Sequence, residues 1–159
     1  MKIFITNRKR VEEMGQKGFM KKTALISITD YGDALVELIN EPEFLLQLSF
    51  DDVPVGKALE AEYGRNLTDE EISEAEKELH AFTDEQAKCI VDFYGKIFGK
   101  VNVLICQCEH GESRSAAIAA ALAEYQYGKG IKIFADERYC PNKSVFRKVL
   151  LRLQIDSGR

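Results

Sequence analysis

The chain has 159 residues, 45% of them hydrophobic, and a formal net charge of -4. This size and composition predict a single domain over residues 1–159. The acidic balance argues against nucleic-acid binding, and the sequence shows neither a signal-like leader nor a run long enough to cross a membrane. We therefore expect a cytoplasmic protein with no nucleic-acid or membrane partner, and the sequence does not determine its oligomeric state.

Four short runs rich in β-branched or aromatic residues are typical of strands. They cover residues 2–6, 23–29, 44–50 and 100–106. Between the first three, residues 7–18 and 33–40 have the pattern of helices. This alternation predicts an α/β fold with a mostly parallel central sheet of four to five strands flanked by helices.

Two capping boxes mark helix starts in the middle of the chain. Thr68 pairs with Glu71 in "TDEE", and Thr83 pairs with Gln86 in "TDEQ". We expect the first helix, about residues 69–80, to lie on the surface because it is very acidic. The second helix has one apolar face, which predicts that it packs against the core.

The C-terminal part of the chain is rich in helix-forming residues. An alanine-rich run at 115–128 predicts a long helix, and residues 131–135 favour a short one. Pro141 and Asn142 then precede an amphipathic helix over 143–153.

The segment "CQCEHGESRSAA" at 106–117 joins the last strand to the alanine-rich helix. In such an arrangement the backbone N–H groups of the loop can converge on one anion. Gly111 gives the freedom in φ that a tight loop needs. Arg114, in the first turn of the helix, carries a planar guanidinium that matches two phosphate oxygens. These residues predict a site for phosphate or a similar oxyanion.

Cys108 is expected at the floor of this loop, where the helix N-terminus, the amides and Arg114 favour a thiolate. A thiolate beneath a bound phosphate can take the phosphoryl group from a substrate oxygen, and water then hydrolyses the phosphocysteine. Arg114 stabilises the charge of each transition state in this scheme. The Ser115 hydroxyl eases the departure of the sulfur in the second step. The scheme needs no cofactor, and the cysteine spacing predicts no metal site.

Residues 108–115, "CEHGESRS", resemble the C-x5-R signature of cysteine-dependent protein tyrosine and dual-specificity phosphatases, in which the loop joins a strand to a helix. The likeness extends in the same order to "ALISITD", "LSFDDV", "FTDEQAKCIVDFYGKIFG" and the late "CPN". It implies hydrolysis of phosphotyrosine or similar phosphomonoesters, on a phosphorylated protein or a small molecule. It leaves out residues 55–81, which we interpret as an acidic helical insertion. The residues expected to bind phosphate are Glu109, His110, Gly111, Glu112, Ser113 and Arg114.

The resemblance also implies an aspartic acid on a loop after an upstream strand. Such a residue protonates the leaving oxygen and later helps to activate water. The matching segment is "SFDDVP", where Asp52 is the better match and Asp51 the alternate. Asp84 is a rival, but its place inside "TDEQ" gives it an ordinary role at a helix start.

Two features depart from the pattern of the family. Gln107 stands where a histidine usually precedes the nucleophile, which removes one polar support for the thiolate. Glu109 and Glu112 put two carboxylates in the loop, and we expect their side chains to point outward. Their charge opposes a bound dianion, so that activity would be slow or the substrate would bring positive charge next to its phosphate. His110 is expected at the rim of the loop or simply on the surface.

Two other functions use the same residues. A pseudophosphatase would keep the loop and Arg114 to hold a phosphorylated partner without turnover. An arsenate reductase or sulfurtransferase would share the loop and Cys108, and arsenate reduction would need Cys140 or Cys106 as a resolving thiol. We expect Cys106 to pack in the core, because it lies one strand step behind Cys108.

Overall fold

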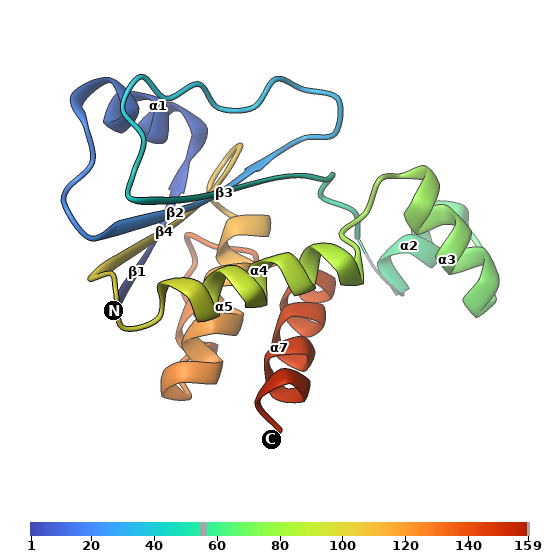
Figure 1. The fold of residues 1–159 in the computed structure, drawn as a ribbon. Coiled ribbons are helices and arrows are strands. Elements are labelled where there is room, and N and C mark those ends of the chain that lie inside the picture. The colour runs from blue at the N-terminus through green and yellow to red at the C-terminus, as the bar shows by residue number, and fades with distance from the viewer. Residues whose placement is uncertain (55–56, 159) are drawn as a thin grey trace.

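A computed structural model describes residues 1–54 and 57–158. Its centre is a sheet of four parallel strands in the order β1-β4-β2-β3 (Figure 1). The strands are β1 (Lys2–Asn7), β2 (Thr23–Thr29), β3 (Phe44–Ser49) and β4 (Val103–Cys108). The predicted α/β fold with a parallel central sheet is confirmed.

The register of the strands brings four loops to one edge of the sheet. Asn7 at the end of β1 lies opposite Cys108 at the end of β4, and Ser27 of β2 lies opposite Gln107. Parallel strands have their carboxyl ends at the same edge, which is where open α/β sheets bind ligands. The loops after β1, β2, β3 and β4 therefore meet there.

Helices cover both faces of the sheet (Figure 1). On one face, α1 (Arg8–Lys17) buries Val11 with Leu25 and Ile105. The other face carries the larger core, to which three helices contribute. These are α4 (Asp84–Ile97), α5 (Arg114–Tyr127) and α7 (Lys143–Ser157).

Three further helices complete the described part of the chain. They are α2 (Lys57–Tyr63), α3 (Asp69–Glu78) and α6 (Ile131–Phe134). Figure 1 shows α2 and α3 together at one side of the sheet. Val55 and Gly56, the first residues of the insertion expected at 55–81, lie outside the described residues. None of the helices in residues 1–54 and 57–158 is long and apolar enough to cross a membrane.

Both predicted capping boxes are present. The hydroxyl of Thr68 accepts a hydrogen bond from the amide of Glu71, whose carboxylate accepts one from the amide of Thr68. Thr83 and Gln86 make the same reciprocal pair at the start of α4. These local signals fix where α3 and α4 begin.

Residues 33–40 form no helix, so the prediction of one there was wrong. Val36 is buried in the smaller core and Leu38 packs beside it, two positions along the chain. A Cβ on Gly15 would lie 2.6 Å from Cδ2 of Leu38, so this segment crosses α1 at close range. The side-chain amide of Asn40 also donates to the Gly15 carbonyl. These contacts with α1 override the local helix preference.

Candidate active site

Cys108 ends β4 at the carboxyl edge of the sheet, and only 2% of it is exposed. Its Sγ lies 3.0 Å from Oγ of Ser115, which is fully buried in the first turn of α5. A hydroxyl that donates to sulfur stabilises a thiolate. The pair places the sulfur beside a hydroxyl, next to the loop formed by residues 109–113.

Gly111 allows this loop to lie against the end of β1. Its φ is +74°, a conformation that side chains with a Cβ rarely adopt. A Cβ there would also lie 2.6 Å from the carbonyl carbon of Thr6 and 2.9 Å from the amide nitrogen of Asn7. Both the conformation and the close approach to β1 require glycine.

The guanidinium of Arg114 is buried, with 4% of the residue exposed. Nη1 donates to the carbonyl oxygen of Phe50 at 2.6 Å, and Nη2 forms an ion pair of 2.5 Å with Asp30. Among the described residues Nε has no hydrogen-bond partner. A buried N–H without a partner is costly, so this atom is suited to bind an anion.

Asp52 contacts the loop directly, whereas Asp51 binds a neighbouring segment. Oδ1 of Asp52 accepts hydrogen bonds from the Ser113 hydroxyl at 2.9 Å and from the side-chain amide of Asn142 at 2.8 Å. Asp51 instead accepts from the amide of Tyr31 at 2.9 Å. Asp84 lies in the first turn of α4, beside a different hollow.

Comparison with solved structures identifies this arrangement of elements. Tk-PTP in its active form matches with a TM-score of 0.53 and 13% identity, over 98% of this chain and 92% of that one. PTPMT1 in complex with PI(5)P also gives 0.53 and 13%, over 99% and 93%. A further PTPMT1 structure gives 0.50 and 16%, over 92% and 86%. All are cysteine-dependent tyrosine or dual-specificity phosphatases.

The chain has the fold of a cysteine-dependent phosphatase. This confirms the resemblance drawn from the sequence at the level of the fold. No protein-family model matches the chain, and no curated protein sequence does.

In this phosphatase fold, the loop has backbone donors to spare. Within the described part of the chain, the amides of residues 110–113 donate to no protein acceptor. The loop is held through its carbonyls instead, since that of Glu109 accepts from the amide of Arg8 and that of Glu112 from the amide of Cys140. Amide N–H groups without a protein acceptor, together with such an arginine N–H, are the donors from which oxyanion sites are built.

Asn142 is a site residue that sequence reasoning missed. Its Nδ2 donates to Asp52 and to the carbonyl of Val53 at 2.9 Å, while its Oδ1 caps α7 by accepting from the amides of Ser144 and Val145. Its own amide donates to the Ser113 carbonyl. An asparagine before an amphipathic helix signals the cap, but only the fold shows what the other end of its amide reaches.

Asp30, the partner of Arg114, was missed as well. It directly follows β2, the strand beside β4, so its position is set by the sheet order. The available signal was an acidic residue at the end of a buried strand. That signal becomes specific only when the strand order is known.

The unusual Gln107 does not face the sulfur. It is fully buried, its Oε1 accepts from the Ser27 hydroxyl at 2.6 Å, and its Nε2 donates to the Ile28 carbonyl. Successive strand residues point to opposite faces, so this side chain ties β4 to β2 on the face away from Cys108.

The remaining polar side chains of the loop point outward or are exposed. The carboxylate of Glu109 lies 3.8 Å from Nη1 of Arg8, at the start of α1. Glu112 and His110 are both exposed. Outward side chains leave the centre of the loop to the backbone and Arg114.

The other cysteines lie in two environments. Cys106 is fully buried in the larger core, and this burial raises the pKa of its thiol far above the ordinary value, with a smaller contribution from Cys108. Cys140 is exposed on the segment that holds the loop at Glu112. Cys106 therefore packs as an apolar side chain.

Proposed function

We propose that this protein is a hydrolase that removes phosphate from phosphotyrosine or a similar phosphomonoester through a phosphocysteine intermediate. The observation that carries the proposal is the buried Cys108, whose Sγ lies 3.0 Å from Oγ of Ser115, together with the buried Arg114, whose Nε has no hydrogen-bond partner among the described residues. PTPMT1, which shares the fold, has been crystallised with PI(5)P, a phosphomonoester. A cytoplasmic location is part of the proposal, because the reaction needs a reduced thiol.

In the first step, Nε of Arg114 and the amides of residues 110–113 hold the phosphate oxygens. The Cys108 thiolate attacks phosphorus, and the bond from phosphorus to the leaving oxygen breaks with its electrons on that oxygen. Asp52, the general acid in this proposal, gives its proton to the leaving oxygen. Charge on the transferring group is stabilised by donors that are already in place.

In the second step, water attacks the phosphocysteine and gives a proton to the Asp52 carboxylate. The bond between sulfur and phosphorus breaks, and Cys108 leaves as a thiolate while inorganic phosphate forms. The Ser115 hydroxyl, 3.0 Å from Sγ, donates to the sulfur as its charge returns. The enzyme is thereby restored without a cofactor.

Both hydrogen bonds to Asp52 are made to Oδ1. Oδ2 is then the oxygen that carries the proton toward the substrate. The proposal assigns the acid role to Asp52 rather than to Asp51 because Asp52 contacts Ser113 of the loop, whereas Asp51 accepts from the amide of Tyr31.

The test is turnover of p-nitrophenyl phosphate by the wild type and by Cys108→Ser. Turnover should disappear in Cys108→Ser and persist in Cys140→Ser, a control that removes an exposed thiol. Equal turnover by Cys108→Ser and the wild type would refute the proposed chemistry. Vanadate binding without any turnover by the wild type would instead identify a pseudophosphatase.

A further inference from the structure

The mouth of the Cys108 loop carries an excess of carboxylates. Asp51 and Asp52 lie on the segment after β3, and Glu112 lies in the loop itself. Asp33 lies in the turn after β2, where its amide donates to the Asp30 carbonyl. Within the described residues, these four form no ion pair with lysine or arginine, and all except the half-exposed Asp51 are exposed.

Two arginines next to the loop are already matched by other carboxylates. Arg114 pairs with Asp30, and Arg8 pairs with both Glu12 and Glu109. The four carboxylates without an ion pair place negative charge around a site proposed to bind a phosphate dianion. A substrate that brings more negative charge is repelled, while one with a cation beside its phosphate is attracted.

An aromatic surface continues from this mouth. Tyr31 follows Asp30 and stacks on His80, with ring centroids 3.6 Å apart and an interplanar angle of 18°. Tyr31 is 57% exposed, so a substrate side chain can reach its ring. Aromatic rings of this kind attract lysine and arginine side chains.

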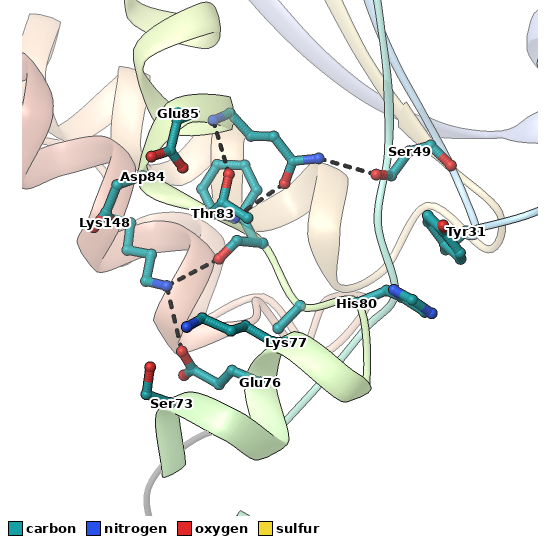
Figure 2. Close-up of a pocket in the computed structure, with 13 residues that line it drawn as sticks. Tyr31, Ser49, Ser73, Glu76, Lys77, His80, Thr83, Asp84, Glu85 and Lys148 are labelled. Atoms are coloured by element: carbon teal, nitrogen blue, oxygen red, sulfur yellow. Dashed lines mark hydrogen bonds and ion pairs between the residues drawn. The ribbon is translucent and has the colours of Figure 1, made fainter. Parts of the chain in front are cut away.

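The stacked pair also borders a hollow of about 430 Å³ between α3, α4 and α7 (Figure 2). There Lys148 forms an ion pair with Glu76 at 3.6 Å and donates a hydrogen bond to the Phe82 carbonyl. The other charged side chains that line the hollow are Lys77, Asp84 and Glu85, which again leaves a negative balance. A peptide that passes from the mouth over Tyr31 therefore reaches a hollow with a small negative balance of charge.

We propose, on the basis of the function proposed above, that the substrates are phosphotyrosine segments of proteins with lysine or arginine next to the phosphotyrosine. The flanking cation lies among the carboxylates of the mouth and against Tyr31. Charge complementarity of this kind affects mainly the rate of encounter and the choice of partner. Polyanionic phosphates are poor substrates for the same reason.

The test compares phosphotyrosine peptides of equal length whose flanking residues are either lysine and arginine or aspartate and glutamate. At low salt, kcat/KM should be about tenfold higher for the basic peptide. The ratio should fall as salt is raised, because the Debye length shortens to about 8 Å at physiological ionic strength. Equal values, or a preference for the acidic peptide or for an inositol phosphate, would overturn the inference.

Two surface variants test whether the peptide preference comes from the carboxylates at the mouth. Glu112→Gln and Asp33→Asn should each lower the ratio of basic to acidic peptide, whereas Glu13→Gln, which removes an exposed carboxylate from α1, should not. An equal effect of Glu13→Gln would refute a role for the mouth. p-Nitrophenyl phosphate has no flanking charge, so its turnover tests the proposed hydrolase function without the peptide preference. If it is not hydrolysed, both fail, and if it is hydrolysed without a peptide preference, only this inference fails.

Discussion

Nδ2 of Asn142 lies 2.8 Å from Oδ1 of Asp52, a residue 90 positions away in the chain. Ser113 donates to the same oxygen, so three separate loops meet at one carboxylate. Each loop follows a different element, and hydrogen bonds between them fix the carboxylate relative to Cys108. Precise positioning of this kind is what a general acid needs.

Asn142→Asp tests this positioning directly. Aspartate keeps an oxygen that can cap α7 but cannot donate to Asp52, and it adds a like charge beside it. Hydrolysis of a substrate with a poor leaving group should fall at least about tenfold. In urea unfolding, Asn142→Asp should lose less stability than Asn142→Ala, which also removes the cap at a cost of about 1 kcal/mol. Wild-type kinetics for Asn142→Asp would contradict the assignment.

Asp52→Asn should slow phenyl phosphate far more than p-nitrophenyl phosphate. The good leaving group needs little protonation, while the poor one depends on an acid worth about 100-fold or more. Steady-state kinetics on both substrates measures the difference. Asp51→Asn is the matched control, since its carboxylate caps the Tyr31 amide. Equal slowing of the two substrates by Asp52→Asn would remove this residue from the chemistry.

Gly111→Ala should destabilise the protein more than Gly99→Ala. The two glycines have nearly the same φ, +74° and +76°, so each substitution costs about 1–2 kcal/mol for the left-handed conformation. Only at Gly111 does the new Cβ also meet the backbone of Thr6, whereas nothing lies within 4 Å at Gly99. Urea unfolding should show the difference, and equal losses would mean that the loop does not pack on β1 as described.

The rate of alkylation should differ between the exposed cysteines and the buried Cys106. Cys89 and Cys140 are exposed and should react with iodoacetamide before Cys106. Cys106 should stay unmodified between pH 7 and pH 9, because its raised pKa keeps the thiolate form rare over this range and its side chain is buried. Peptide mass spectrometry gives the order of reaction. Labelling of Cys106 as fast as Cys140 would mean that it is not core packing.

Features coded by neighbouring residues could be predicted from the sequence. The capping boxes need only two residues three positions apart, and both are present at α3 and α4. The buried strand before residues 108–115 and the alanine-rich helix after them also follow from local pattern. The sheet, and the position of Cys108 where β4 leads toward α5, could therefore be predicted from the sequence.

Features set by tertiary contacts could not be predicted in this way. Residues 33–40 have a helical pattern, yet they pack across α1 and form no helix. Asp30 and Asn142 look like an ordinary strand end and an ordinary cap, and their contacts with Arg114 and Asp52 depend on which loops meet at the edge of the sheet. Such pairings are fixed by topology, which no local pattern records.

The central claim is that phosphate passes through the sulfur of Cys108. Ser115→Ala removes the hydroxyl that aids the second step, so the intermediate should accumulate during turnover. Acid quenching followed by peptide mass spectrometry of this variant should find phosphate on Cys108 when substrate is present. Turnover with phosphate on another residue, or with none on Cys108 in this variant, would contradict the account.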